Sequence, residues 1–115
     1  MLQKLRTVIY HVADLQKATN WYIELTGLQP YFQEAFYVGF DINGCELGLD
    51  PDMTGIEAGN HTVSYWSVED IHGAVEKAVF LGAKVISPVQ NVGGTIETAT
   101  VEDPFGNHLG FITGA

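Results

Sequence analysis

Cysteine and basic residues are scarce in this chain. A single cysteine, Cys45, stands among 115 residues, which excludes a disulfide framework and a zinc site built from thiolates. Five lysines and arginines stand against fourteen aspartates and glutamates, for a formal net charge of −9. A surface of that sign repels phosphate backbones and anionic membranes, so we expect neither nucleic acid nor a membrane as a partner.

Long apolar runs are also missing. No run approaches the roughly 20 residues of a transmembrane helix, and residues 1–6 lack the apolar core of a signal peptide. We therefore expect a cytoplasmic protein. Hydrophobic residues make up 46% and charged residues 17% of the chain, a composition typical of a folded protein with one core.

One stretch of the chain occurs twice. Residues 41–49 and 103–111 share the pattern Asp-x-x-Gly-x-x-Leu-Gly-apolar, 62 positions apart. A second matching pair, residues 12–15 with Ala18 and residues 68–71 with Ala74, is 56 positions apart. Because both pairs occur in the same order, we infer that one unit is present in two copies. A longer loop at residues 87–94 of the second copy would account for the difference of six residues.

Each copy reads as a strand, a helix and three more strands. The first copy has strand patterns at residues 5–12, 31–33, 36–40 and 45–49, with a helix between Asp14 as N-cap and Gly27. The second has strand patterns at residues 61–68, 84–87, 96–101 and 108–112, with a helix between Asp70 and Gly82. We expect Pro88 to stop the strand at residues 84–87. Residues 51–60 are rich in turn formers and are predicted to be a linker.

The predicted class is therefore α+β, with two tandem βαβββ modules at about residues 1–50 and 61–115 of a single domain, residues 1–115. A βαβββ module covers one face of its sheet with its helix and leaves the other face bare. Two such sheets can join into an eight-stranded, incompletely closed barrel around a concave cleft. Small-molecule sites are typically concave, so the cleft is where we expect a ligand.

These motifs resemble those of the vicinal oxygen chelate superfamily, which includes glyoxalase I, extradiol dioxygenases, fosfomycin resistance enzymes and bleomycin resistance proteins. The resemblance covers nearly the whole chain. It is carried by residues 12–15, Tyr22 and residues 25–28 in the first copy, and by residues 68–71, 81–83 and 103–107 in the second. It implies the fold more specifically than the function, because the superfamily hosts several reactions and plain ligand binding on one scaffold.

The resemblance also implies where a metal would be bound. The metal enzymes of the family place ligands seven residues before each helix-capping aspartate and seven residues after each turn aspartate. In this chain those positions hold Thr7, Gly48, Val63 and Gly110. None offers an imidazole or a carboxylate, the groups that bind Zn²⁺, Ni²⁺, Fe²⁺ or Mn²⁺ well. We therefore expect no metal at these positions and no other cofactor.

Strand alternation predicts which other side chains share the cleft with these four positions. The predicted ligand-binding residues are Thr7, Ile9, His11, Glu46, Gly48, Val63, Tyr65, His108 and Gly110. Tyr65 could stack on an aromatic ligand, and Glu46 and His108 occupy equivalent places in the two copies. As candidate catalytic residues, this pair could act as general acid and base; alternatively the two could bond to each other, or form a non-standard metal site with His11.

Other residues are predicted to be structural. Cys45 is expected to be buried, His61 and His72 solvated, and Glu102 directed to water. The aromatic residues expected to pack in the core or against the helices are Trp21, Phe32, Phe36, Tyr37, Phe40 and Trp66, with Phe36 and Phe40 as the exceptions that could lie near the cleft instead.

Three functions are compatible with the sequence. The first is a metal-independent protein, resembling bleomycin resistance proteins, that binds a small organic ligand in the cleft between the two modules, as a homodimer. The second is a glyoxalase-like lyase or isomerase that uses a displaced metal site or the Glu46 and His108 pair. The third is an interaction protein that uses only the scaffold.

Overall fold

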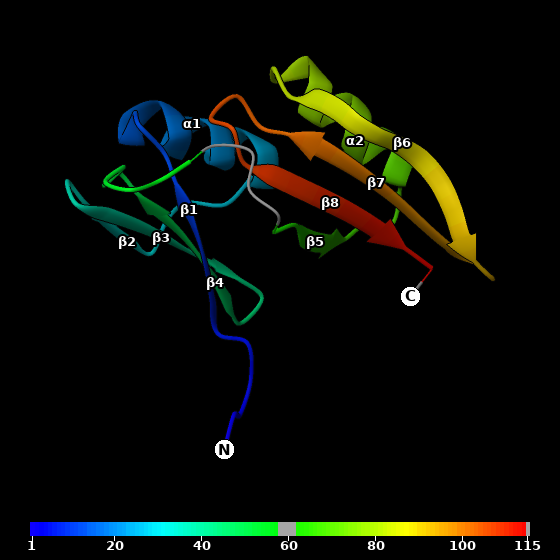
Figure 1. The fold of residues 1–115 in the computed structure, drawn as a ribbon, viewed down its shortest axis with the longest axis horizontal. Coiled ribbons are helices and arrows are strands. Elements are labelled where there is room, and N and C mark those ends of the chain that lie inside the picture. Colours follow the sequence, from blue (N-terminus) through cyan, green and yellow to red (C-terminus); the bar gives the residue numbers. More distant parts are fainter. Residues whose placement is uncertain (58–61, 115) are drawn as a thin grey trace. The chain divides into compact units, whose positions relative to one another are not determined.

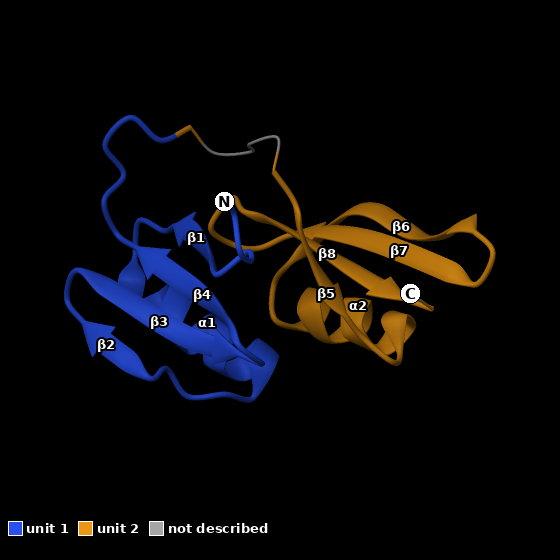
Figure 2. Ribbon diagram, turned by 90° about the horizontal axis from the view of Figure 1, so that it is seen from below, with its two compact units in different colours: residues 1–56 blue, residues 57–115 orange. Residues whose placement is uncertain are grey.

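The computed structural model describes residues 1–57 and 62–114. The chain forms two compact units, Met1–Ile56 and Glu57–Ala115 (Figure 2). Each unit contains one helix and a four-stranded mixed sheet in the order βαβββ, so the α+β class and the duplicated module are confirmed. The single domain, and the joining of the two sheets into one barrel, stay predictions.

The first unit consists of β1 (Thr7–His11), α1 (Leu15–Thr26), β2 (Phe32–Glu34), β3 (Tyr37–Ile42) and β4 (Cys45–Asp50) (Figure 1). Its strand order is β1-β4-β3-β2. β1 pairs with β4 in parallel, and the other pairs are antiparallel. At the turn between β3 and β4, Asn43 and Gly44 both have positive φ, 50° and 95°, which suits a tight hairpin.

Helix α1 begins and ends as the sequence predicts. The Asp14 carboxylate accepts a hydrogen bond from the Lys17 backbone N–H at 3.0 Å. Gly27 ends the helix in the left-handed region, at φ 72°, and its N–H donates to the Ile23 carbonyl at 2.8 Å. The helix packs on one face of the sheet, and the buried apolar side chains of this unit are Tyr10, Val12, Ala18, Trp21, Tyr22, Val38, Phe40, Leu47 and Leu49.

The second unit consists of β5 (Ser64–Ser67), α2 (Ile71–Phe80), β6 (Lys84–Gly93), β7 (Ile96–Glu102) and β8 (His108–Thr113), with the strand order β5-β8-β7-β6. The Asp70 carboxylate caps α2 by accepting from the Gly73 N–H at 3.0 Å. α2 packs on one face of this sheet, over a buried set that comprises Ile71, Ala78, Ala83, Ala99, Val101, Leu109 and Phe111.

The strand registers of the two units support the duplication. Ile9 pairs with Gly48 in the first unit, and Tyr65 pairs with Gly110 in the second. Tyr65 follows Ile9 by 56 positions and Gly110 follows Gly48 by 62, the two offsets seen in the sequence. The matching stretches therefore occupy equivalent places in the two sheets.

The prediction that Pro88 stops a strand is wrong. β6 runs from Lys84 to Gly93, through Pro88. A proline is tolerated here because β6 is an edge strand whose register with β7 shifts between Val85 and Ser87 and again between Ser87 and Gln90. Most of the residues expected as a loop at 87–94 thus belong to a longer strand.

Part of the predicted linker and the start of the strand after it lie outside the residues that the structure describes. Residues 58–60 of the predicted linker, and His61 of the predicted strand, lie outside the described residues. The described part of that strand begins at Ser64. Neither of the two described helices is long and apolar enough to cross a membrane.

Candidate functional site

The face of the first sheet that lies opposite α1 carries the residues predicted from strand alternation. Thr7 of β1 lies next to Glu46 of β4, and Ile9 lies next to Gly48. Gly48 is in turn opposite Gly39 of β3. Partners in register point to the same side of a sheet, so these side chains share one surface, as predicted.

Glu46 is the centre of this surface because several donors converge on its carboxylate. Oε1 accepts hydrogen bonds from the Thr7 hydroxyl at 3.1 Å and the Tyr37 hydroxyl at 3.0 Å. Oε2 accepts a hydrogen bond from the Tyr31 hydroxyl. Arg6 Nη1 lies 3.6 Å from Oε1 and donates to Thr7 Oγ1 at 2.8 Å. The Glu46 side chain is only 12% exposed, so its charge is held by these neighbours rather than by bulk water.

These contacts move the acid–base equilibria of three groups. The hydrogen bond from Tyr31 is the largest cause of a lowered Glu46 pKa, and the bonds from Tyr37 and Thr7 act in the same direction. Burial, followed by the hydrogen bond to Glu46, raises the pKa of Tyr37 to about 12. The same hydrogen bond is the main cause of a raised Tyr31 pKa. At neutral pH the cluster is therefore one carboxylate surrounded by protonated phenols.

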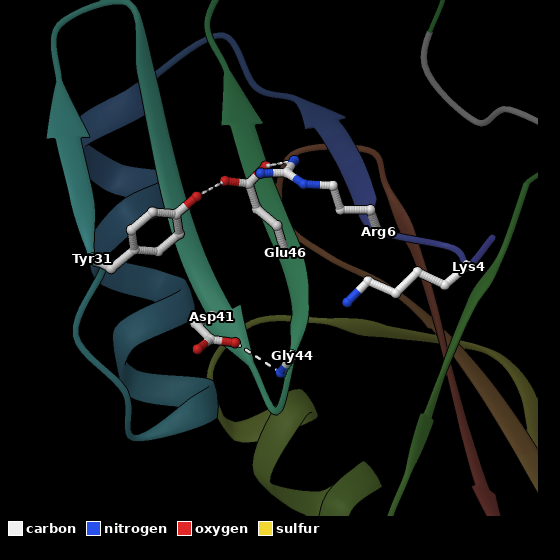
Figure 3. A pocket seen from close by; sticks show the side chains of 6 residues that line it. All are labelled: Lys4, Arg6, Tyr31, Asp41, Gly44 and Glu46. Atoms are coloured by element: carbon white, nitrogen blue, oxygen red, sulfur yellow. Dashed lines mark hydrogen bonds and ion pairs between the residues drawn. The ribbon is translucent and has the colours of Figure 1, made fainter.

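A hollow of about 380 Å³ opens beside Glu46 on the first unit (Figure 3). Its lining residues are Lys4, Arg6, Tyr31, Asp41, Gly44 and Glu46. Asp41 Oδ1 accepts from the Gly44 N–H at 2.8 Å, which closes the turn between β3 and β4. The side chains of Lys4 and Arg6 extend from the segment before β1 toward the hollow (Figure 3). The hollow is thus a polar pocket with one aromatic wall.

Two of the four family metal positions are glycines covered by tyrosine side chains. A Cβ on Gly48 would lie 1.9 Å from the hydroxyl oxygen of Tyr37 and 2.6 Å from Cζ. A Cβ on Gly110 would lie 2.5 Å from Cδ1 and Cε1 of Tyr65. Each glycine therefore allows a ring to approach the backbone where a side chain would otherwise stand.

The donors at the four positions do not suit a metal. Gly48, Val63 and Gly110 have no side-chain donor atom, and the Thr7 hydroxyl is already bonded to Glu46. Within residues 1–57 and 62–114, no three or more His, Cys, Asp or Glu residues are grouped so that they could hold a metal ion. The ligand set that the family uses is therefore not reproduced here.

The second candidate catalytic residue, His108, is engaged within its own unit. It lies directly opposite Glu102 in the pairing of β7 with β8, and His108 Nε2 is 3.7 Å from Glu102 Oε1. Glu102 therefore shares a face with His108, and its side chain, which was expected to face water, is 30% exposed. The Glu46 carboxylate likewise bonds to residues of the first unit, namely Arg6, Thr7, Tyr31 and Tyr37.

The remaining predicted site residues lie in varied settings. His11 Nδ1 is 2.9 Å from the backbone carbonyl oxygen of Asp52. Ile9 is 47% and Tyr65 53% exposed, and both therefore present apolar surface to solvent. Val63 precedes β5 and is half-buried.

Several aromatic residues and Cys45 are not where the sequence predicted. Phe36 is 67% and Phe32 38% exposed, so neither belongs to the core. Tyr37 turns to the face opposite α1 and bonds to Glu46. Cys45 is half-buried rather than buried. The prediction is correct for Trp21, which is buried, and Phe40, named as a possible exception near the cleft, is buried as well. Trp66 is half-buried and donates from Nε1 to Ser64 Oγ at 2.9 Å.

Sequence reasoning missed Tyr31 and Tyr37 as parts of the site. A signal for Tyr37 does exist, because the tight turn at residues 41–44 sets Gly39 opposite Gly48 and so places Tyr37, two residues earlier, on the same face. No comparable signal marks Tyr31, which precedes β2 and reaches Glu46 through the length of its side chain.

Solved structures with the same fold come from several bacteria. A glyoxalase/bleomycin resistance protein/dioxygenase family enzyme from Burkholderia phytofirmans PsJN has a TM-score of 0.83 at 16% identity, covering 96% of this chain and 98% of its own. A glyoxalase-related enzyme from Fulvimarina pelagi has a TM-score of 0.80 at 18% identity, covering 97% and 88%. The fosfomycin resistance protein FosX from Listeria monocytogenes has a TM-score of 0.83 at 15% identity, covering 100% and 96%. At these identities the likeness shows the fold alone.

The sequence itself carries the family assignment. A comparison with curated proteins found no match. The family model described as Glyoxalase/Bleomycin resistance protein/Dioxygenase superfamily, however, matches residues 4–111, nearly the whole chain. The resemblance read from the motifs is confirmed: this chain belongs to the glyoxalase/bleomycin resistance protein/dioxygenase superfamily.

Proposed function

We propose that this protein binds a small organic ligand without the help of a metal ion, in the hollow beside Glu46. The observation that carries the proposal is the set of donors around Glu46, together with the tyrosine that covers Gly48. Where the metal enzymes of the family have ligands, this unit has a hydrogen-bonded cluster of one carboxylate, two phenols and a threonine. Such a cluster fixes the shape and charge of a binding surface.

The same contacts argue against Glu46 as a general base. A base works best when its pKa lies near the working pH, whereas the pKa of Glu46 is lowered by the Tyr31 hydrogen bond. Both oxygens of the carboxylate already accept hydrogen bonds from the protein. The chemistry that remains for Glu46 is to hold Tyr31 and Tyr37 in place against the sheet.

In the second unit, we expect Tyr65 to provide a separate surface for stacking. Its ring lies against Gly110, and the side chain remains about half exposed, at 53%. An aromatic ring with one face on the backbone and the other open to solvent is suited to an aromatic ligand. His108, two positions before Gly110 on the same strand, would add a polar contact beside it.

The alternative is a glyoxalase-like lyase or isomerase, with a displaced metal or with Glu46 and His108 as an acid–base pair. Mutation separates the two functions. In a binding protein, Tyr31→Ala, which removes the aromatic wall of the hollow, weakens binding of an aromatic ligand, and Glu46→Gln changes it modestly. In an acid–base enzyme, Glu46→Gln removes most of the turnover while binding is retained.

The site can be located before its ligand is known. The uniformly ¹⁵N-labelled protein would be titrated with a panel of small aromatic and polar compounds, and the backbone amides followed by NMR. Gly39, Gly44 and Gly48 report on the hollow and its surroundings, whereas Gly27, at the end of α1, is the internal control. We expect saturable shifts at the first three and none at Gly27. A panel that shifts none of the three, at concentrations that saturate weak sites, contradicts the proposal.

Two further properties belong to this proposal. We expect a homodimer, for which light scattering should give about twice the chain mass of 12.6 kDa, and we expect the protein in the cytoplasm. A mass of one chain at all concentrations contradicts the dimer and leaves the ligand site in the first unit unaffected, because all of its lining residues come from one unit.

A further inference from the structure

The charges around the hollow are unusual for so acidic a chain. Only five lysines and arginines occur in the whole sequence, and two of them, Lys4 and Arg6, line this one pocket. The remaining basic residues, Lys17, Lys77 and Lys84, lie on α1, α2 and β6. Basic side chains are thus concentrated where a ligand would enter.

The two carboxylates of the hollow already accept hydrogen bonds from other groups of the protein. Both oxygens of Glu46 accept hydrogen bonds from hydroxyl groups, and Arg6 lies near one of them. Asp41 accepts the Gly44 N–H that closes the turn. Protein donors thus compensate part of the negative charge on this side of the hollow, which reduces its pull on a cationic ligand.

The two basic side chains of the hollow, by contrast, have hydrogen-bond donors that no protein group accepts from within the described residues. The amino group of Lys4 makes no hydrogen bond or ion pair with the rest of the described chain. The Arg6 guanidinium contacts Thr7 and Glu46 through Nη1, which leaves its other N–H donors for a ligand. The Arg6 side chain is 71% exposed, so these donors are accessible. Figure 3 shows Lys4 and Arg6 on the same side of the hollow, across from Tyr31.

We infer that the ligand of this hollow carries a negatively charged group, a carboxylate or a phosphate ester, bound by Lys4 and Arg6, with an adjoining ring against Tyr31. This inference rests on the proposed function and specifies its ligand class. The net charge of −9 does not oppose it at close range, because at physiological salt charges farther away than about 8 Å are largely screened. Tyr31 is 61% exposed and offers its ring as the apolar wall.

Charge-matched probes test the inference. Benzoate and phenyl phosphate carry the anion on a ring, whereas benzamide has nearly the shape of benzoate without its charge. Each would be titrated into the ¹⁵N-labelled full chain, with the Gly44 amide and the Arg6 Nε–H as reporters. We expect saturable shifts with at least one anion, and affinity about tenfold lower for benzamide. The tighter of the two anions identifies carboxylate or phosphate as the preferred group.

The decisive variant is Lys4→Gln, because the Lys4 amino group makes no hydrogen bond or ion pair within the described residues that the substitution would remove. It should weaken anion binding about tenfold, whereas Lys17→Gln, which removes the same charge from α1, should leave it unchanged. Equal binding of benzoate and benzamide, or no effect of Lys4→Gln, overturns the anionic ligand and leaves the proposed function standing. The anionic ligand is also overturned if none of the three probes shifts the Gly44 amide. The proposed function is then tested by the wider compound panel alone.

Discussion

The hydroxyl of Tyr37 occupies the space in which a side chain at position 48 would begin. A Cβ built on Gly48 meets the Tyr37 oxygen at 1.9 Å, closer than any real contact of this kind, and the same oxygen bonds to Glu46 at 3.0 Å. The glycine and the tyrosine therefore depend on each other. A side chain at position 48 requires that Tyr37 move, and Tyr37 cannot move without releasing Glu46.

Gly48→Ala should consequently destabilise the protein by about 1–3 kcal/mol, the usual cost of overpacking a well-filled site. Urea denaturation would measure the change in the free energy of unfolding. The same substitution in a Tyr37→Ala background is the control, since the clash is then absent and the cost of the added methyl should largely disappear. An undiminished cost in that background would show that Tyr37 is not the obstacle.

Gly110→Ala should cost less, below about 1 kcal/mol, although the built Cβ lies 2.5 Å from the Tyr65 ring. The reason is that Tyr65 is 53% exposed and can rotate into solvent, whereas Tyr37 is bonded to a largely buried carboxylate. The measurement is again urea denaturation. In the double variant Gly110→Ala, Tyr65→Ala the remaining cost should vanish, and a cost in the Gly110→Ala single variant equal to that of Gly48→Ala would contradict this argument.

The Tyr37 hydroxyl should ionise only near pH 12, because burial and the bond to Glu46 raise its pKa from 10.0 to about 12. Since the folded pKa lies above the unfolded one, the stabilisation from this group is complete below pH 10.0 and is lost as the pH rises through about 12. Glu46→Gln should lower the Tyr37 pKa without returning it to 10.0, because burial is the larger cause.

The titration would be followed through the ¹³Cζ resonances of labelled tyrosine, with the Tyr37 signal assigned by its absence in Tyr37→Phe. All five tyrosines of the chain are observed together, so Tyr10, Tyr22 and Tyr65 serve as internal references, whereas the pKa of Tyr31, which also bonds to Glu46, should fall with that of Tyr37. A Tyr37 pKa that does not change in Glu46→Gln would mean that the carboxylate has no influence on the phenol.

The fold was predictable because its signals are local and occur twice. Asp14 and Asp70 cap their helices as predicted, and the repeated turns place Gly48 and Gly110 at equivalent points of the two sheets. Pro88 is the exception. A proline stops a central strand but not an edge strand with shifted register, and edge position is a property of the assembled sheet that no local pattern reveals.

The candidate site was predictable only in part. Strand alternation correctly placed Thr7 and Glu46 side by side, because a period of two assigns each residue to a face. It says nothing of how far a long side chain extends, so Tyr31 was missed, which the sequence placed at the start of a strand and the structure places just before β2. It also allowed Glu102 to be assigned to solvent, since its neighbour His108 becomes apparent only when the register of β7 and β8 is known.

Removal of either helix cap should lower stability by about 1 kcal/mol. Asp14 accepts from the Lys17 N–H and Asp70 from the Gly73 N–H, each at 3.0 Å, so Asp14→Ala and Asp70→Ala each leave one backbone donor without its side-chain acceptor. Urea denaturation of both variants gives the comparison. Asn at each position retains an acceptor oxygen and should recover most of the loss, whereas an equal loss in the Ala and Asn variants would assign the effect to the charge.

Purified protein should hold well under one tightly bound transition-metal ion per chain. The physical reason is the donor set: Gly48, Val63 and Gly110 offer no donor atom, and the hydroxyl of Thr7 is a poor ligand for Zn²⁺, Ni²⁺, Mn²⁺ or Fe²⁺ compared with imidazole or carboxylate. Mass spectrometry of metal content, on untagged protein from medium supplemented with all four metals, measures this directly. About one ion per chain after dialysis would contradict the prediction, and loss of that ion in His11→Ala or His108→Ala would then identify a displaced site and favour the lyase or isomerase.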